Sequence, residues 1–236
     1  MKHLNILIDF DDTLACRKGK WTATIYQILQ GNGYPDITQE MIEPFTCYGF
    51  PWHDHEISHR DFFKGQPWWE YMNQVIGKAM ISAGVDSSHA PGLAAQFKEC
   101  FLDIDQWSLF EDTIPFLEKI TNNHTCYIAS NHVPELSKLV EGLGINEYFS
   151  GIYNSAHMGF EKPNKMFFQS ILDDLGCDND EVLMIGDSYK ADIIGAEGLG
   201  IRAVLVRHEN IFKYKHYAPN LFESIKYIQD LPEGPN

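Results

Sequence analysis

The segment that decides the fold covers residues 4 to 14 and reads Leu-Asn-Ile-Leu-Ile-Asp-Phe-Asp-Asp-Thr-Leu. Its apolar start predicts a buried strand, and Asp9, Asp11 and Asp12 follow where that strand ends. Because side chains alternate along an extended segment, Asp9 and Asp11 point to one side and Phe10 to the other. Two carboxylates in one small volume need a cation, and a hard ion such as Mg2+ prefers oxygen ligands. The segment therefore indicates either a metal site for phosphate chemistry or a solvated turn without a chemical role.

The composition of the 236-residue chain is that of a folded, acidic protein. Apolar residues make up 44% and aromatic residues 13% of the chain, which is enough to bury a sizeable core. The net charge of −15 and the pI near 4.9 argue against binding to nucleic acid or to an anionic membrane, because both need clusters of Lys and Arg. We therefore expect no nucleic-acid partner and no membrane partner.

The cysteines predict a reducing compartment. They are odd in number, far apart and without a C-x-x-C pair: Cys16, Cys47, Cys100, Cys126 and Cys177. This pattern favours neither a zinc module nor a disulfide framework. The apolar stretch before Asp9 is too short for the core of a signal peptide, and no window approaches the length of a membrane span. We therefore expect a cytoplasmic protein.

The second half of the chain alternates between strand-like and helix-like segments. Apolar runs predict further strands at residues 125 to 130, 151 to 154, 181 to 186 and 202 to 206. Apolar residues at three- and four-residue spacing predict helices at residues 114 to 120, 134 to 143, 164 to 175 and 189 to 199. Such alternation is typical of an α/β fold, in which helices cover a parallel sheet.

Residues 16 to 107 interrupt this pattern. They contain no convincing buried strand, but helix-like stretches rich in aromatic residues lie around residues 25 to 29, 39 to 45, 60 to 80 and 93 to 102. Pro67 could break the third of these stretches. We therefore divide the chain into an α/β core, residues 1–15 and 108–236, and an inserted helical cap, residues 16–107. Because open parallel sheets bind ligands at the carboxyl ends of their strands, the cap is expected to cover Asp9 and Asp11 like a lid.

Two later segments carry residues that a phosphoryl-transfer site at Asp9 would need. Ser130 and Asn131 follow a predicted strand, and their hydroxyl, amide and backbone N–H groups could hold phosphate oxygens. Capping of the following helix is the competing interpretation of this pair. Lys162 precedes Pro163, whose fixed ring could anchor an ammonium group that offsets the charge of a carboxylate and a phosphate. A solvated loop lysine is the alternative there.

The segment at residues 182 to 192 is more specific. Asp187 ends a predicted buried strand, and Asp192 falls one turn into the next predicted helix. Asp187 could complete a metal site with Asp9. Asp192 could orient Lys162 or a metal-bound water, or it could simply stabilise the positive end of its helix.

Together, these residues resemble the four motifs of the haloacid dehalogenase superfamily. In chain order the matches are Asp9-Phe10-Asp11-Asp12-Thr13, Ser130, Lys162-Pro163, and Gly186-Asp187-Ser188 with Asp192. The order is that of the family, and the match spans nearly the whole chain. The resemblance implies a Rossmann-like parallel sheet core with helices on both faces and an α-helical bundle cap of the C1 type, inserted between the first two motifs. Asp12 stands where many members have Gly, but Asp tolerates unusual backbone angles.

The resemblance also implies a role for each residue. Asp9 would attack phosphorus to form an aspartyl phosphate, and Asp11 would protonate the leaving alcohol and then activate water. Mg2+ would be held by the carboxylates of Asp9 and Asp187 and by the backbone carbonyl of Asp11. The residues implied to bind the transferring group are Thr13, Ser130, Asn131 and Lys162. Lys162 would also be catalytic, because it offsets charge at Asp9, and Asp192 would support it.

These roles predict a Mg2+-dependent phosphatase that acts on a small phosphorylated metabolite, as a monomer or a homodimer. A phosphomutase of the same family is the main alternative, since it passes the phosphoryl group to a second sugar hydroxyl. A haloacid dehalogenase needs neither a second acid at Asp11 nor a metal ligand at Asp187, and a phosphonatase would use a cap lysine. A noncatalytic protein that recruits partners through its aromatic cap is the remaining alternative.

The cap sequence does not reveal the substrate. His53, His55 and His59 could bind a second metal or contact a substrate anion, although only the last two have the spacing of neighbours on a helix. Trp68 and Trp69 are expected to pack within the cap. At most one of them would face the cleft, because adjacent helix positions point in different directions.

Overall fold

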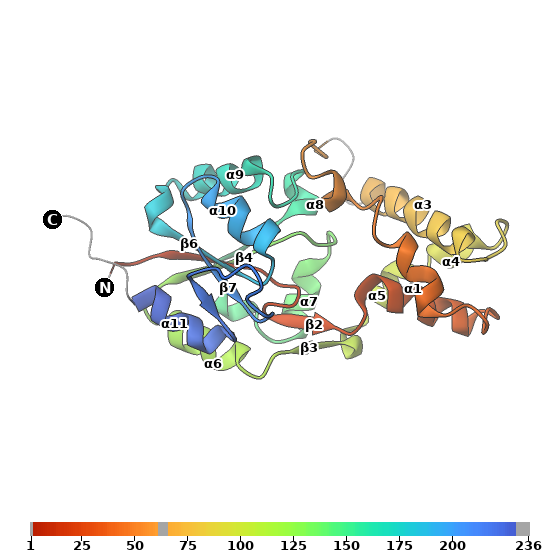
Figure 1. The fold of residues 1–236 in the computed structure, drawn as a ribbon, viewed down its shortest axis with the longest axis horizontal. Helices are drawn as coiled ribbons and strands as arrows, with labels where there is room; N and C mark the ends of the chain where they lie inside the picture. The colour runs from red at the N-terminus through yellow and green to blue at the C-terminus, as the bar shows by residue number, and fades with distance from the viewer. Residues whose placement is uncertain (1, 61–65, 230–236) are drawn as a thin grey trace.

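The fold was obtained as a computed structural model, which describes residues 2–60 and 66–229. Its centre is a six-stranded sheet in the order β5-β4-β1-β6-β7-β8, and all neighbouring strands in it are parallel (Figure 1). The strands are β1 (Asn5–Ile8), β4 (Thr125–Ser130), β5 (Gly151–Asn154), β6 (Val182–Gly186), β7 (Arg202–Val206) and β8 (Tyr217–Ala218). The predicted α/β fold with a parallel sheet is confirmed.

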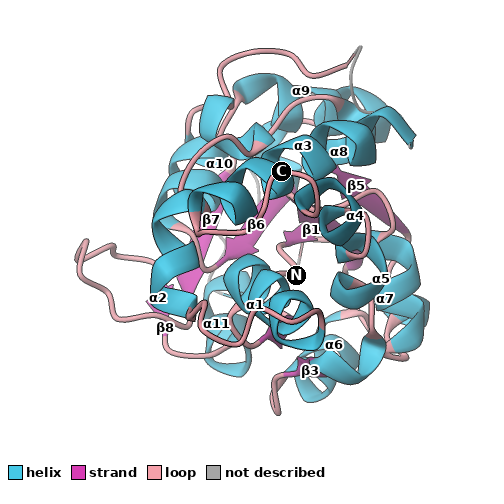
Figure 2. Ribbon diagram, turned by 90° about the vertical axis from the view of Figure 1, so that its right-hand side faces the viewer, coloured by secondary structure: helices cyan, strands magenta, loops and turns pink. Residues whose placement is uncertain are grey.

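The central strand β1 is buried on both faces. The helices that cover the sheet are α6 (Thr113–Ile120), α7 (Leu136–Gly142), α9 (Lys165–Leu175), α10 (Gly195–Glu197) and α11 (Leu221–Gln229). Ile6 and Ile8 belong to one buried cluster with residues of α6, α7 and α11, whereas Leu7 belongs to another with residues of α9 and α10. Figure 2 shows the strands between these two groups of helices. A strand covered in this way has a continuous apolar sequence, as residues 6 to 8 do.

The helices of the predicted cap lie beside the sheet, at the right of Figure 1. They are α1 (Lys20–Gly31), α2 (Gln39–Ile42), α3 (Gln66–Ser82), α4 (Ala90–Ala94) and α5 (Phe97–Phe101). The chain enters this region through β2 (Ala15–Arg17) and leaves it through β3 (Trp107–Leu109), which pair antiparallel. These helices are consistent with a cap, and the division at residues 15 and 107 stays a prediction. Among the described residues, none of the helices is both long and apolar enough to cross a membrane.

Several elements differ from the predicted ones. Shorter helices are η1 (Glu43–Phe45), η2 (Pro51–Asp54), η3 (Ile104–Gln106), α8 (Ser155–Met158), η4 (Asn146–Tyr148), η5 (Asn179–Glu181) and the π-helical η6 (Tyr189–Ile194). The strands β2, β3 and β8 are not predicted, because two or three residues are too few to show an alternating pattern. The helix predicted at 93 to 102 is two helices, α4 and α5, and the one at 189 to 199 is η6 followed by α10.

The predicted third cap helix is described as α3, Gln66–Ser82. Pro67 lies in the first turn of this described range, where a missing N–H removes no helical hydrogen bond. The described helix therefore continues through Pro67 without a break. Part of the predicted range, residues 61–65, lies outside the described residues. The helix α11 is not predicted from the sequence at all, although it covers one face of the sheet.

Polar contacts hold the cap helices against the core. Glu135, just before α7, accepts a hydrogen bond from the indole N–H of Trp69 at 2.9 Å and forms an ion pair with Lys98. The side chain of Asn164 donates a hydrogen bond to the backbone carbonyl of His55 at 2.7 Å. These contacts join α3, α5 and the loop after η2 to the helices of the core. They fix the cap side of the cleft relative to the ends of the strands.

Candidate active site

The turn after β1 brings the first carboxylates into place. The N–H of Asp9 donates to the carbonyl of Ile185 at 2.9 Å, which extends the pairing of β1 with β6 by one residue. The carbonyl of Phe10 accepts the N–H of Leu14 at 3.0 Å and so closes a tight turn. Asp12 lies in this turn with a φ of 57°, a left-handed conformation that Asp adopts more readily than most residues. The replacement of Gly by Asp at this position is therefore accommodated.

Lys162 lies between two of the predicted carboxylates. Its Nζ is 2.7 Å from Oδ1 of Asp9 and 2.6 Å from Oδ1 of Asp192, and it also donates to the carbonyl of Ala129 at 2.8 Å. The lysine side chain is 2% exposed. Burial alone would lower the pKa of Lys162, but Asp192 and Asp9 outweigh this effect and raise the pKa above its usual value. Lys162 is therefore a permanent cation beside Asp9.

The residues at the end of β4 have different partners. The side chain of Asn131 accepts the backbone N–H of Lys162 at 2.7 Å and donates to its carbonyl at 2.9 Å, so it fixes the lysine backbone. The Oγ of Ser130 is buried, lines the cavity and has no hydrogen-bond partner in the described chain. Ser130 is thus available to a ligand, whereas the amide of Asn131 is already engaged. The substrate-binding roles of both residues stay predictions.

Thr13 and Asp187 bond to each other. The Thr13 hydroxyl donates to Oδ1 of Asp187 at 3.3 Å and accepts the backbone N–H of Asp187 at 3.1 Å. The side chain of Thr13 is fully buried, so what it visibly does is to connect the turn after β1 with the end of β6. Its contact with the transferring group stays a prediction. The structure does bring Asp187 next to Asp9, as the sequence predicts.

The donor atoms at the ends of β1 and β6 fit a divalent cation. Carboxylate oxygens of Asp9, Asp187 and Asp192 lie within 4.8 Å of one another, and burial, reinforced by the other two carboxylates, raises the pKa of Asp187 to about 8. A bound cation relieves such repulsion, and Mg2+ prefers an all-oxygen set. Both oxygens of Asp192 are already bonded within the protein, which leaves Asp9 and Asp187 as carboxylate ligands. Among the described residues, the Asp11 carboxylate is outside this group, so only its backbone carbonyl is left as the predicted ligand.

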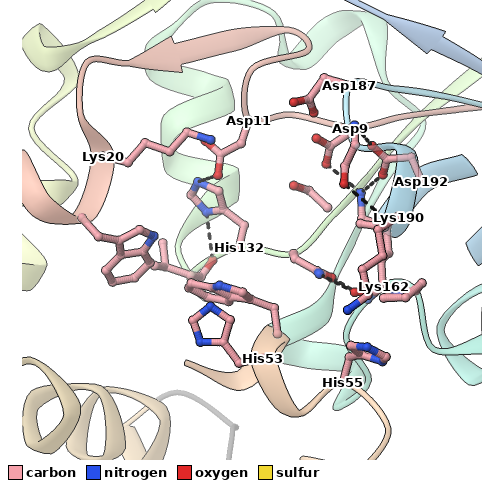
Figure 3. A pocket seen from close by; sticks show the side chains of 18 of the residues that line it. Asp9, Asp11, Lys20, His53, His55, His132, Lys162, Asp187, Lys190 and Asp192 are labelled. Carbon is pink, nitrogen blue, oxygen red and sulfur yellow. Dashed lines mark hydrogen bonds and ion pairs between the residues drawn. The ribbon is translucent and has the colours of Figure 1, made fainter. Parts of the chain in front are cut away.

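Asp11 has a different environment from Asp9. Its carboxyl group lies 3.9 Å from Nε2 of His132 and 4.0 Å from Nζ of Lys20 (Figure 3). Burial raises the pKa of Asp11 above its ordinary value, and Lys20 and His132 offset this only in part. Burial also lowers the pKa of His132, which favours its neutral ring. The site thus places Asp11, a carboxyl group whose pKa is raised by burial, beside Asp9, which is paired with the ammonium group of Lys162.

A cavity of about 440 Å³ opens beside these carboxyl groups. Figure 3 shows Asp9, Asp11 and Asp187 at one end and the cap residues His53 and His55 at the other. Both histidines line the cavity. The cap therefore contributes part of the wall that a substrate would touch.

The other cap residues singled out in the sequence lie elsewhere. His59 is buried, with its Nδ1 4.0 Å from a carboxylate oxygen of Glu161. In the described part of the chain, no group of three potential metal ligands includes a cap histidine. Trp68 and Trp69 are both buried, and neither belongs to the lining of the cavity. Both tryptophans belong to the buried apolar cluster, and the indole N–H of Trp69 also contacts Glu135 of the core.

Several residues near the site have no sequence motif. Arg207 donates to the carbonyl of Thr13 through Nη2 at 2.6 Å and Nε at 3.0 Å, and so braces the turn that carries the carboxylates. His208 lies 3.1 Å from Oδ2 of Asp187. Arg207 and His208 directly follow β7, and His132 follows β4 by one residue. Their position at the carboxyl ends of parallel strands is the signal that could have identified them.

Gly186 has no room for a side chain. A Cβ there would lie 2.1 Å from Oδ2 of Asp192. We expect Gly186→Ala to displace Asp192 and to lower the free energy of unfolding by about 1–3 kcal/mol. Because Asp192 holds the ammonium group of Lys162, its displacement should also move Lys162 and reduce kcat. Denaturant unfolding measures the first effect, with Gly31→Ala as a control, because a Cβ there meets no atom within 4 Å. Equal stability of the two variants would contradict the close approach of Asp192.

Glu161 is a buried carboxyl group next to Lys162. It is 1% exposed, and burial raises its pKa to about 7 from an ordinary value of 4.5. Between these two values the folded state binds more protons than the unfolded state, so stability falls as the pH rises. Glu161→Gln has no carboxyl group there and should not lose stability in this way. We therefore expect the free energy of unfolding of the variant, measured relative to that of wild type, to be about 2–3 kcal/mol higher at pH 8 than at pH 5.

Urea unfolding across that pH range measures the difference between Glu161→Gln and wild type. The exposed Glu111→Gln is the matched control, and its difference from wild type should not change with pH. A Glu161→Gln difference that is equally constant would show that Glu161 ionises normally in the folded protein.

The chain belongs to the family of haloacid dehalogenase-like hydrolases, which matches it over residues 6–206. It is therefore a hydrolase of this family, as the motifs predict. The six-stranded parallel sheet with helices on both faces is the Rossmann-like fold of its relatives.

Similar proteins include two curated phosphatases. The chain is 36% identical over 77 residues to glyceraldehyde 3-phosphate phosphatase from Methanothermobacter thermautotrophicus, covering 33% of this chain and 34% of the relative. It is 30% identical over 139 residues to phosphoserine phosphatase from Thermus thermophilus, covering 58% and 54%. The matches thus span from a third to just over half of these relatives. Among solved structures, YfnB from Bacillus subtilis bound to magnesium superposes with a TM-score of 0.76 and 17% identity, over 98% of this chain and 100% of that chain.

Proposed function

We propose that the protein is a Mg2+-dependent phosphatase that hydrolyses a small-molecule phosphate monoester through an aspartyl phosphate on Asp9. The observation that carries this proposal is the contrast between two neighbouring carboxyl groups. Asp9 forms an ion pair at 2.7 Å with the ammonium group of Lys162, whereas burial raises the pKa of Asp11. Carboxyl groups in opposite environments are typical of a nucleophile beside a general acid.

Each residue has a defined step in this reaction. The Asp9 carboxylate attacks phosphorus, and the bond to the leaving oxygen breaks while Asp11 donates its proton to that oxygen. Asp11 then takes a proton from the water that attacks the aspartyl phosphate, so that Asp9 is restored and inorganic phosphate is released. Lys162 and the hydroxyl of Ser130 hold the phosphoryl oxygens.

The supporting residues keep these groups in position. Asn131 fixes the backbone of Lys162, and Thr13 fixes Asp187. Mg2+ held by Asp9 and Asp187 supplies positive charge that offsets the repulsion between carboxylates and a phosphate dianion. This charge is needed because the net charge of the protein, −15, has the wrong sign for an anionic substrate.

The relatives and the composition support the wider setting that we propose. Two relatives are phosphatases by name, although the phosphate esters in their names differ from each other. We propose a small phosphorylated metabolite as the partner, without nucleic acid or membrane, and a monomer or homodimer as the assembly. The cysteines are all free, which agrees with a cytoplasmic location.

Removal of the metal tests the proposal directly. Phosphate release from p-nitrophenyl phosphate should require Mg2+ and should fall on the order of 100-fold or more in excess EDTA, because a metal supplies several kcal/mol of charge stabilisation. Renewed addition of Mg2+ should restore the rate. The Asp9→Asn variant, purified in parallel, reports any contaminating phosphatase. Turnover that EDTA leaves unchanged would exclude the metal from the reaction.

The reaction products distinguish a phosphatase from a phosphomutase. Phosphorus NMR of a reaction with a hexose 1-phosphate distinguishes free phosphate from an isomeric sugar phosphate. We expect free phosphate. Accumulation of the isomer would assign the same residues to a mutase.

A further inference from the structure

Aromatic side chains line the end of the cavity that the cap forms. Trp21 from α1 and Trp52 from η2 both line the cavity and are half-buried, with ring centroids 5.3 Å apart. His53 and His55 lie at the same end, across the cavity from Asp9 (Figure 3). The organic part of a phosphate ester bound at Asp9 would therefore extend toward these rings.

The two indole rings pack against buried phenylalanine rings of the cap. Trp52 stacks on Phe50 with a centroid distance of 4.9 Å and an angle of 9°, and Trp21 stacks on Phe97 at 5.0 Å and 7°. Phe50 and Phe97 are at most 1% exposed, so they are parts of the buried core of the cap. A preorganised aromatic surface binds a flat partner with little loss of side-chain entropy.

The cavity is larger than the smallest phosphate esters require. Its volume of about 440 Å³ falls within the range of pockets that bury drug-sized ligands, roughly 300–1,000 Å³. A phosphoryl group on a chain of two or three carbons would leave the aromatic end to water. A larger apolar group that covers Trp21 and Trp52 gains free energy in proportion to the area it removes from water.

The charged groups of the lining do not form a cluster that would hold a second anion. Lys20, which reaches the cavity from the cap, is paired with Asp12 at 2.8 Å. Lys190 of η6, an exposed side chain near His53, is the remaining lysine of the lining apart from Lys162. Burial lowers the pKa of His53, which favours its neutral ring. A buried phosphate or carboxylate is usually held by a cluster of Arg or Lys. The imidazole rings of His53 and His55 instead offer hydrogen bonds to an uncharged group, whereas the Thr46 hydroxyl is already bonded to the carbonyl of Glu43 and the hydroxyl of Thr22.

We propose that the substrate is a phosphate monoester whose alcohol carries an uncharged planar ring, aromatic or heteroaromatic, which stacks against Trp52 and Trp21 while the phosphate lies at Asp9. This inference rests on the proposed phosphatase function and adds the class of its substrate. Uridine 5′-monophosphate and benzyl phosphate have this chemistry. Glycerol 3-phosphate and phosphoglycolate carry a phosphate ester without a ring.

Steady-state kinetics with these four compounds test the substrate class. Stacking of one base on an aromatic side chain contributes about 1–3 kcal/mol, so kcat/KM should be roughly 5- to 150-fold higher for the two ring compounds. Benzyl phosphate and glycerol 3-phosphate both release an alkyl alcohol, and this comparison therefore isolates the ring from leaving-group chemistry.

Variants of Trp52 separate stacking from a general apolar effect. Trp52→Leu keeps apolar volume but has no flat face, so it should raise KM for the ring compounds about 10-fold and leave kcat within a factor of about two. The kinetics of glycerol 3-phosphate should not change. Trp52→Phe should recover most of the lost affinity. Tyr48→Leu, an exposed cap aromatic outside the cavity lining, is the matched control and should behave as wild type.

A binding measurement in a variant without turnover tests ring recognition independently of the phosphatase activity. In the Asp9→Asn background, uridine 5′-monophosphate should quench tryptophan fluorescence, and Trp52→Leu should weaken that binding about 10-fold. Equal kcat/KM for ring and ringless compounds, or a Trp52→Leu effect of the same size on both, would overturn the substrate class while leaving the phosphatase function intact. Absence of turnover with all four compounds would count against the phosphatase function, and the fluorescence titration would still decide whether a ring binds at Trp52.

Discussion

Asp9→Asn is expected to lower kcat on the order of 10,000-fold or more while the protein remains folded. An amide oxygen carries no charge and cannot form a stable acyl phosphate with the substrate. It can still accept a hydrogen bond from Lys162, whose Nζ lies 2.7 Å from the position it would occupy. Initial rates of phosphate release at saturating Mg2+ measure the loss, and thermal unfolding checks that the fold is retained.

The control for this substitution is Asp105→Asn, the same chemical change at an exposed position of the cap. It should leave both kcat and stability close to wild type. If Asp9→Asn kept a tenth or more of the wild-type kcat, Asp9 could not be the nucleophile. A water molecule activated by another group would then have to attack phosphorus directly.

Lys162→Met is expected to lose both activity and stability. In the wild-type protein, Asp9 and Asp192 share the ammonium group of Lys162. The substitution leaves both carboxylates buried without a cation. Breaking a buried ion pair by removing one partner typically costs about 3–5 kcal/mol. The phosphoryl oxygens also lose a preorganised positive charge, so kcat should fall on the order of 1,000-fold. Denaturant unfolding and phosphate release measure the two effects on the same sample.

A second substitution separates these two effects. Burial raises the pKa of Asp192 to about 6, and the loss of Lys162 removes the charge that opposes this shift. Lys162→Met combined with Asp192→Asn should therefore regain most of the stability without regaining activity. Lys165→Met, an exposed lysine at the start of α9, is the control and should be nearly neutral. Recovery of activity in the double variant would show that Lys162 acts only on the fold.

The centre of the sheet could be predicted because the strands β1 and β6 are buried on both faces. Residues 6 to 8 and 182 to 186 read as uninterrupted apolar runs, and glycines or polar residues mark their ends. The short strands β2, β3 and β8 could not be predicted, since each pairs through backbone hydrogen bonds over at most three residues. The start of α11 does carry a signal, because Asn220 precedes it and Glu223 follows three residues later, and the N–H of Glu223 donates to Oδ1 of Asn220.

Part of the candidate site also follows from the sequence. Asp9 and Asp187 directly follow β1 and β6, Lys162 lies in the connection after β5, and Asp192 lies in the helix that follows β6, so all four meet at the carboxyl ends of the strands. The sequence does not show how strongly each of the carboxyl groups interacts with Lys162. These interactions depend on burial and on the distance of each carboxylate from Lys162, which are properties of the assembled fold.

Lys20, His132 and Glu161 illustrate what remains out of reach of the sequence. Lys20 reaches Asp11 and Asp12 only because β2 turns the chain back past the end of β1. His132 becomes significant through the burial of its ring beside Asp11. Glu161 looks like an ordinary loop glutamate until the loop is folded under the cap. The environments of His132 and Glu161 depend on tertiary contacts between segments that are distant in the chain.

The antiparallel pair of β2 and β3 places Arg17 directly opposite Trp107. The whole intervening segment therefore departs from and returns to one point of the molecule, and a short hairpin turn could close the chain there if the segment were absent. The six strands of the parallel sheet and the proposed catalytic residues Asp9, Asp11 and Lys162 lie outside this segment. In evolutionary terms, the segment proposed to select the substrate could be exchanged, enlarged or lost while the sheet and the proposed reaction are inherited together.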